Sequence, residues 1–289
     1  RMSARKSVVV AAKTEAVPAT STQIPSRVAP QARIMPLRVF DNTGSVTGTI
    51  TIDQAWNIGT FDASLRTSAM TLTTSTNNPL VYGDWKFGTG VTSSSTAGNI
   101  IFSGRGTETI TSNGVTFNCP INIDCVIGTV NLADALSLGS ARGLSITSGT
   151  FDAVTYNVTA GNIFISGSAN RVVKMGSATW TCSGTGGDTW NAGATTNLAF
   201  YKGTANIVLS DTSTSTRTFA GGGLSYNKLT IGGTTGTSTL TITGNNQFTE
   251  LASTKTVAHT IALGTTTQTF GKWTVTGTVG NLVTLTGSG

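Results

Sequence analysis

The chain has 289 residues, of which 38% are hydrophobic and only 10% are charged, so it can form a continuous core beneath a largely uncharged polar surface. Its net charge of +6 is confined to residues 1–39, which contain seven basic residues and one acidic residue, while the remainder contains eleven of each. We therefore expect no nucleic-acid-binding surface over the whole protein, and the lack of any run of roughly 18 apolar residues argues against membrane insertion.

The first predicted unit is an extended basic arm over residues 1–39. Four prolines between positions 18 and 36 disfavour a regular helix or a central strand, and Val8–Ala12 is its one apolar run. We expect this arm to order only on docking to virion proteins or to sister chains, so a chain lacking residues 1–38 should fold but not assemble. The side chains expected to anchor the partner are Arg5, Lys6, Lys13, Arg27, Arg33 and Arg38.

Residues 40–98 form the second predicted unit, an N-terminal β segment with a capping or attachment role. Apolar and polar residues alternate over residues 46–52 and again over residues 70–73. This period of two is typical of strands that bury one side. Turn-forming runs such as Asp41–Gly44 separate the predicted strands.

Residues 99–289 form the third predicted unit, a repetitive β body. A five-residue phrase that starts with Asn and Ile and ends with Ser begins at Asn99, Asn162 and Asn206. Its offsets, 63 and 44 residues, are near multiples of about 21–22 residues, the length of one coil of a stacked β structure. The chain is therefore predicted to be all-β, with a β-solenoid or β-helix-like stack as the preferred fold and tandem β-sandwiches as the alternative.

The repeats also predict which positions are equivalent. From the shared phrase we expect Ile101, Ile163 and Val208 to occupy equivalent inward positions in a continuous stack. A longer internal similarity relates residues 109–118 to residues 218–227, at an offset near 108–109 residues. This similarity indicates that two halves of the body are divergent copies of each other.

Few residues in the body suggest catalysis. His259 is the only histidine and lies in a strand-like run without a nucleophile motif, so we expect it on the outer face of a strand, with no hydrolytic activity depending on it. Asp124, Asp134 and Asp152 are the densest carboxylates, and we expect them to serve solvated turns rather than glycoside cleavage. The chain is therefore predicted to be non-enzymatic and to need no cofactor.

The three cysteines do not suggest a metal site. Cys119, Cys125 and Cys182 have no CxxC spacing, and a single histidine could join them as a further ligand. We therefore expect no metal ion and interpret all three cysteines as small buried hydrophobic residues.

One aromatic residue suggests a ligand. Trp190 lies between Asp188 and Asn191 in a predicted loop, and an exposed indole ring beside such polar groups can stack on a sugar. The trio is our candidate contact for a host-surface glycan. Packing of the Trp190 ring in the core is the interpretation we prefer, because tryptophan is so often partly buried.

Residues 217–231, RTFAGGGLSYNKLTI, are followed by TLTITG at residues 239–244. Together with GTFD at residues 149–152 and TYNVTAG at residues 155–161, they resemble the Thr/Gly-rich β-repeat segments of tailed-bacteriophage virion proteins, especially fibre-like proteins. The resemblance covers roughly residues 70–289. It implies a location on the virion surface or tail and brings no catalytic residues with it.

The function expected from these observations is that of a non-enzymatic structural virion protein. It would be a phage tail fibre or filament subunit, homo-oligomeric and assembled through its N-terminal arm. The alternatives are a capsid decoration protein, a secreted bacterial adhesin, and a tailspike-like glycan depolymerase.

Overall fold

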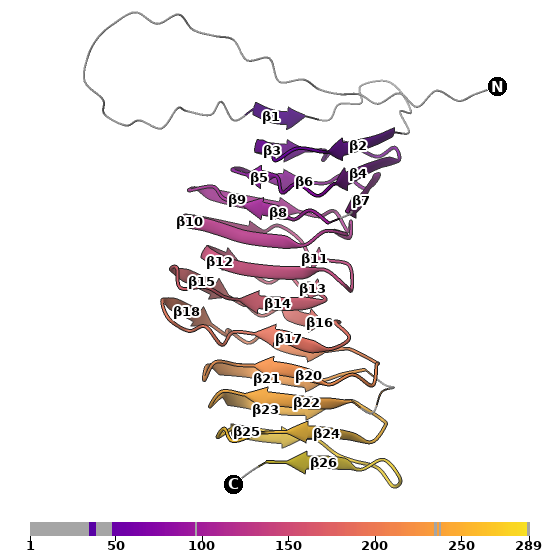
Figure 1. Cartoon of the computed structure of the whole chain (residues 1–289), viewed down its shortest axis with the longest axis vertical. Coiled ribbons are helices and arrows are strands. Elements are labelled where there is room, and N and C mark those ends of the chain that lie inside the picture. Colours follow the sequence, from indigo (N-terminus) through magenta and orange to yellow (C-terminus); the bar gives the residue numbers. More distant parts are fainter. Residues whose placement is uncertain (1–34, 39–47, 96, 234–235, 237, 288–289) are drawn as a thin grey trace, which may run out of the picture.

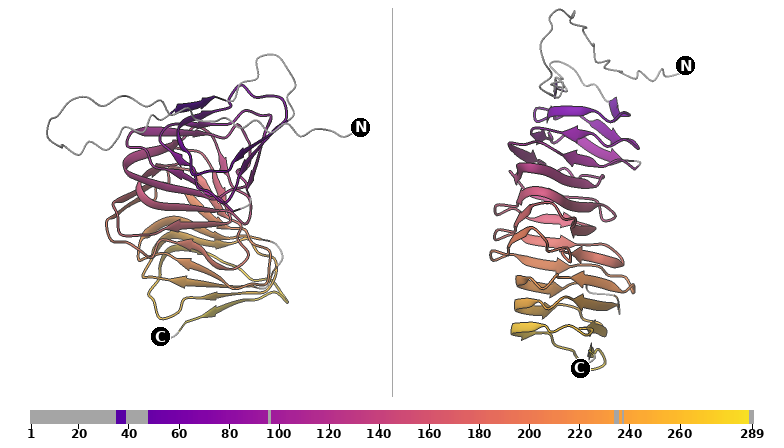
Figure 2. Two further views of the ribbon diagram at one scale, coloured as in Figure 1. Left: turned by 45° about the horizontal axis from the view of Figure 1, so that its top comes forward. Right: turned by 60° about the vertical axis from the view of Figure 1, so that its left-hand side comes forward.

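The computed structural model describes residues 35–38, 48–95, 97–233, 236 and 238–287. In this part of the chain every regular element is a β-strand, and the strands stack in parallel, coil upon coil, along one axis (Figures 1 and 2). The chain is therefore an all-β solenoid, as predicted. The alternative of tandem β-sandwiches is wrong, because sandwiches are built from antiparallel sheets.

The first face of the solenoid runs along the whole stack as part of a 16-stranded sheet. Its strands are β3 (Asn57–Asp62), β5 (Leu80–Val81), β8 (Ile100–Phe102), β10 (Ile121–Leu132), β12 (Gly143–Asp152), β14 (Asn162–Ile165), β17 (Gly187–Asn191), β20 (Arg217–Ala220), β22 (Thr239–Thr243), β24 (His259–Ala262) and β26 (Val283–Thr286).

The second face belongs to the same sheet, because β3, β10 and β12 continue onto it through their C-terminal halves. Its other strands are β1 (Met35–Arg38), β6 (Trp85–Lys86), β9 (Thr107–Thr111), β15 (Arg171–Lys174) and β18 (Leu198–Tyr201).

The third face consists of a three-stranded and a seven-stranded sheet. Its strands are β2 (Gly48–Ile52), β4 (Met70–Thr74), β7 (Val91–Ser95), β11 (Leu136–Ser137), β13 (Val158–Ala160), β16 (Thr179–Cys182), β19 (Asn206–Leu209), β21 (Ser225–Ile231), β23 (Gln247–Ser253) and β25 (Thr269–Thr274).

The cross-section narrows after β18, the last strand of the second face. In the next coil the chain leaves β20 and passes through residues 221–224 directly into β21 on the third face. The stack therefore has three faces up to β18 and two faces beyond it.

The core follows from the alternation of side chains along each strand. In the second face, Val130, Phe151 and Val173 pair with one another in register and are all fully buried. Elsewhere aromatic rings stack between coils, as in Trp190 on Phe219, with ring centroids 5.9 Å apart. Each such buried side chain contributes roughly 1.5–3 kcal/mol, so the stack is held by apolar columns as well as by its backbone ladders.

The predicted equivalence of Ile101, Ile163 and Val208 is wrong. Ile163 points inward and is fully buried, whereas Ile101 and Val208 are half-buried on the outer side of their strands. The phrase at Asn206 forms β19 on the third face, while the other two copies form β8 and β14 on the first face. Ile163 is the second residue of its phrase, whereas Ile101 and Val208 are the third, so they point to the opposite side of the strand. In addition, the coils differ in length, so residues 44 positions apart lie on two different faces.

The internal similarity between residues 109–118 and 218–227 reflects the same type of turn at two corners of the solenoid. Asn113 and Gly114 have φ values of 49° and 76°, and Gly222 and Gly223 have 65° and 75°. Both left-handed pairs turn the chain onto the third face, but the first follows a second-face strand and the second follows a first-face strand. The sequence similarity therefore identifies one type of turn, and the two halves do not correspond strand by strand.

The boundaries predicted at residues 39 and 98 do not interrupt the stack. Met35–Arg38, the end of the predicted arm, forms β1 and pairs with β3 in the first coil. Across residue 98, β5 pairs with β8 as any two neighbouring coils do. Residues 40–98 therefore share the architecture of the body where the structure describes them.

One corner contains backbone strain. Val154 has a φ of 57° and is 43% exposed, while the next two coils place Gly176 and Gly203 at this corner. A left-handed conformation costs a residue with a Cβ about 1–2 kcal/mol. The strain at Val154 is thus avoidable.

Replacing Val154 with Gly is expected to raise the free energy of unfolding by about 1 kcal/mol, because relief of strain exceeds the entropic cost of glycine. Urea denaturation measures the change. Gly176→Ala is the matched control and is expected to destabilise, since its Cβ would lie 1.9 Å from the Val154 carbonyl oxygen. A lower unfolding midpoint for Val154→Gly would contradict the assignment of strain.

Candidate functional site

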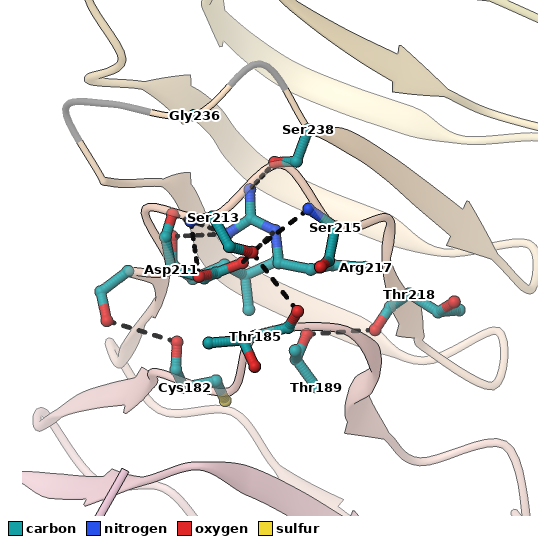
Figure 3. Close-up of polar contacts among 12 residues, drawn as sticks. Cys182, Thr185, Thr189, Asp211, Ser213, Ser215, Arg217, Thr218, Gly236 and Ser238 are labelled. Atoms are coloured by element: carbon teal, nitrogen blue, oxygen red, sulfur yellow. Dashed lines mark hydrogen bonds and ion pairs between the residues drawn. The ribbon is translucent and has the colours of Figure 1, made fainter. Parts of the chain in front are cut away.

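Buried polar groups gather at the corner between the third and first faces, in the C-terminal part of the stack (Figure 3). At its centre is Arg217, the first residue of β20, which is fully buried. Its Nη1 donates to the Leu209 carbonyl at 3.3 Å and its Nη2 donates to Ser238 Oγ at 3.1 Å. Its Nε lies 3.8 Å from Asp211 Oδ2, so the guanidinium links three segments of neighbouring coils.

Asp211 organises the loop over this corner. Its Oδ1 accepts the backbone N–H of Ser213 at 2.8 Å, and its Oδ2 accepts the Ser213 hydroxyl at 2.7 Å. The Ser213 Oγ in turn accepts the backbone N–H of Ser215 at 3.2 Å (Figure 3). This local pattern explains why Asp and Ser occupy a tight corner that has no regular strand partner.

Lys255 places a second buried cation at the same corner. Its Nζ donates to the Gly236 carbonyl at 3.0 Å. Burial lowers the pKa of Lys255, and the charge of Arg217 lowers it further. Burial also lowers the pKa of Arg217, against the opposing effect of Asp211. The two cations thus share one carboxylate and otherwise satisfy the carbonyl groups of the corner loops.

The prediction that His259 lies on an outer face is wrong. His259 is only 4% exposed, because as the first residue of β24 it has the same inward direction as Ile261. Its Nδ1 lies 2.9 Å from the Val257 carbonyl oxygen, and its Nε2 lies 3.0 Å from Ser253 Oγ. Since a carbonyl oxygen only accepts, Nδ1 carries the proton and, in the neutral ring, the Ser253 hydroxyl donates to Nε2. The pair ties the end of β23 to the start of β24.

The predicted loop around Trp190 is a strand, and its ring is not available to a sugar. Trp190 lies in β17 with no exposed surface, and its Nε1 donates to Tyr226 Oη at 3.3 Å. Asn191 Nδ2 donates to Asp188 Oδ2 at 2.8 Å. The alternation of β17 turns Trp190 inward and leaves Asp188 and Asn191 half-buried, so the trio does not form the candidate glycan contact, and the preferred assignment of the ring to the core is confirmed.

The three carboxylates predicted to serve turns accept hydrogen bonds from nearby groups. Asp134 accepts two backbone N–H groups of the neighbouring coil, at 2.7 and 2.6 Å. Asp152 accepts the backbone N–H of Val154 at 2.8 Å, and Asp124 accepts the Ser148 hydroxyl at 2.8 Å. Each carboxylate therefore has a structural partner at its own corner or strand end.

A buried carboxylate that the sequence did not reveal lies near the corner between the first and second faces. Glu108 is 1% exposed in β9, at an inward position that Val130 occupies in the next coil. Its Oε2 lies 3.9 Å from Cys125 Sγ, and its Oε1 has no hydrogen-bond partner among the described residues. Burial raises the pKa of Glu108 to about 7, and the charge of Asp84 adds to the rise. The only sequence signal was an acidic residue at an inward position of the strand period.

The interpretation of the cysteines as small buried hydrophobic residues is confirmed. Cys119, Cys125 and Cys182 are free and fully buried. Burial is the largest cause that raises the pKa of each thiol to about 12. At neutral pH the three thiols are therefore protonated.

A shallow groove of about 380 Å³ lies where β15 and β18 begin. Asn170, Thr195 and Asn197 contribute polar groups to its lining, and Val172 and Ala199 contribute aliphatic surface.

Most of the predicted anchoring residues lie outside the described part of the chain. These are Arg5, Lys6, Lys13, Arg27 and Arg33. The sixth, Arg38, is the last residue of β1, and its backbone is paired with Asp62 of β3.

Within the described ranges, no helix is long and apolar enough to cross a membrane, and no three His, Cys, Asp or Glu residues lie close enough together to hold a metal ion. No protein-family model, no curated protein and no solved structure matches this chain.

Proposed function

We propose that this chain is a structural shaft subunit of a virion, of the tail-fibre type, and that it joins its neighbours through the basic N-terminal arm. The observation that supports the proposal is the pairing of strand β1 with the body of the solenoid. The end of the arm is the first strand of the solenoid, paired in parallel with β3. A partner that holds the arm is therefore connected to the stack through a backbone ladder.

The charge distribution supports the same proposal. All of the net charge lies in residues 1–39, whereas the rest of the chain is neutral overall. A neutral, hydroxyl-rich body has little long-range attraction for other bodies, so the arm is the segment that can attract an acidic or groove-bearing partner. A parallel stack also suits a shaft, because its coils follow one axis at intervals of about 4.8 Å.

Deleting residues 1–34 is expected to leave a folded body that no longer assembles, because β1 is kept and the anchor is removed. Sedimentation velocity and negative-stain electron microscopy of the full chain and the truncated chain measure the difference. Assembly of the full chain should weaken between 0.1 M and 1 M salt, as the Debye length falls from about 10 Å to 3 Å.

The matched control replaces two exposed lysines of the body, Lys174 and Lys272, with Gln and keeps the arm. It removes positive charge from the solenoid alone, so assembly should be unchanged. Normal assembly of the chain that lacks residues 1–34 would refute the anchoring role of the arm.

A further inference from the structure

The second face ends in an open edge at β18. Within the sheet β18 pairs with β15 alone, and the following coil bypasses this face. The edge of β18 that faces away from β15 therefore has no strand partner among the described residues. An unpaired edge of this kind is a template for the backbone of another segment.

The side chains beneath this edge are apolar and uncovered. The inward column of Val130, Phe151 and Val173 is fully buried, and its next member in register is Phe200 of β18. Phe200 and Leu198 point inward, yet both are only half-buried, because no strand lies below them. An added strand would place its own inward side chains against these two residues.

The backbone of β18 offers hydrogen-bonding groups in the same direction. Arg171 and Met175 donate their backbone N–H groups to the carbonyls of Asn197 and Tyr201, which fixes the register of the parallel ladder. In such a ladder alternate residues bond to opposite neighbours, so the N–H and C=O of Phe200 point away from β15. An added extended backbone can satisfy both groups in place of solvent.

Hydrogen bonds and a ring contact hold both ends of β18 in place. The Nη2 of Arg171 donates to the carbonyls of Ala194 and Thr196 at 3.0 and 2.6 Å, in the segment that leads into β18. Beyond the strand, Lys202 Nζ donates to the Tyr226 carbonyl at 3.4 Å. The Phe200 ring also contacts the Tyr226 ring, with centroids 5.3 Å apart. The edge is therefore preformed, which lowers the entropic cost of binding a strand.

We propose that β18 binds residues Val8–Ala12 of the N-terminal arm of a second copy as an added strand. The inference rests on the proposed assembly through the arm and names the surface that receives it. This run is the one uncharged apolar stretch of the arm, and valine favours strands. The 22 residues between Ala12 and β1 can span at most about 73–79 Å, so this segment can reach a neighbouring copy. β1 ends on the face of which β18 is the last strand, so a neighbour shifted along the axis can bring its arm to the open edge of β18.

The direct test titrates a labelled peptide of residues 5–14 into a body that lacks residues 1–34 and follows fluorescence anisotropy. Saturable binding is expected, and Phe200→Lys should weaken it by at least about tenfold by placing a charge beneath the edge. Tyr201→Ala is the matched control: Tyr201 points outward from the same strand, so binding should be unchanged. A Val9→Pro peptide, tested on the unaltered body, should also lose binding, and it keeps the test valid if Phe200→Lys does not fold. Equal binding of both peptides, or none of either, would overturn the proposal.

Measuring the assembly of full-length variants distinguishes a failure of this inference from a failure of the proposed function. If Phe200→Lys assembles normally while the chain without residues 1–34 does not, the arm docks elsewhere and only this inference fails. If the truncated chain assembles normally, the proposed function fails as well. Hydrogen exchange distinguishes the two copies: the β18 amides of the full chain should become protected as protein concentration rises. Protection in the monomer at low concentration would mean that each arm binds its own body, which overturns docking between copies.

Discussion

Replacing Asp211 with Asn is expected to lower the free energy of unfolding by about 3 kcal/mol. The carboxylate forms an ion pair with Arg217, and its negative charge also acts on Lys255; all three residues are at most 6% exposed. Breaking a buried ion pair from one side leaves an uncompensated charge in the interior and costs about 3–5 kcal/mol. The 3.8 Å separation between Arg217 Nε and Asp211 Oδ2 places the expected loss at the lower end of this range. Urea denaturation at neutral pH measures it.

The matched control is the ion pair between Asp152 and Lys174. Lys174 Nζ lies 3.2 Å from Asp152 Oδ2, but the side chains of Asp152 and Lys174 are 22% and 49% exposed. Asp152→Asn is expected to cost less than about 1 kcal/mol, because water already screens this pair. Adding Lys255→Met to Asp211→Asn should restore part of the lost stability, since it removes one of the two unmatched cations. Equal effects of Asp211→Asn and Asp152→Asn would mean that the buried cluster carries no special electrostatic role.

The stability of the protein is expected to fall by about 3 kcal/mol between pH 4.5 and pH 8 because of Glu108. The native pKa of this group is about 7, against an ordinary value of 4.5. Below pH 4.5 both the native and the unfolded chain hold the proton, so the full stability is present. As the pH rises toward 7 the unfolded chain releases the proton while the native chain keeps it, and the free energy of unfolding decreases. The shift of about 2.5 pH units corresponds to about 3 kcal/mol.

Glu108→Gln should remove this dependence, because the amide stays neutral at every pH in the range. Urea midpoints at pH 5 and pH 8 should differ in the wild type and coincide in the variant, apart from the contribution of other groups. Glu250→Gln is the matched control: the pKa of Glu250 is lowered, first by its hydrogen bond with Thr274, and its side chain is half-buried. It should leave the decrease between pH 5 and pH 8 in place. A wild-type chain with equal midpoints at both pH values would show that Glu108 ionises at its ordinary pKa.

Local pattern was sufficient to predict the fold class. Alternating β-branched and aromatic residues, Gly- and Asn-containing turns and a coil length near 21–22 residues all report interactions within one or two strands, and each predicts a stacked β structure. The burial of Cys119, Cys125 and Cys182 followed from the same reasoning, because small apolar residues among strand residues face the core. These properties depend on nearest neighbours in the chain, so the sequence alone determines them.

Register and position depended on the tertiary structure. The phrase at Asn206 matches those at Asn99 and Asn162, but it lies on another face, because insertions at corners change the length of each coil without changing the strands. A shift of one residue along a strand exchanges inside and outside, and this is why Ile101, Val208 and His259 were placed on the wrong side. The cluster around Arg217, the buried Glu108 and the open edge of β18 unite residues from different coils. Such sites arise from the stacking of residues 19 to 30 positions apart in neighbouring coils, and no spacing within a single strand encodes them.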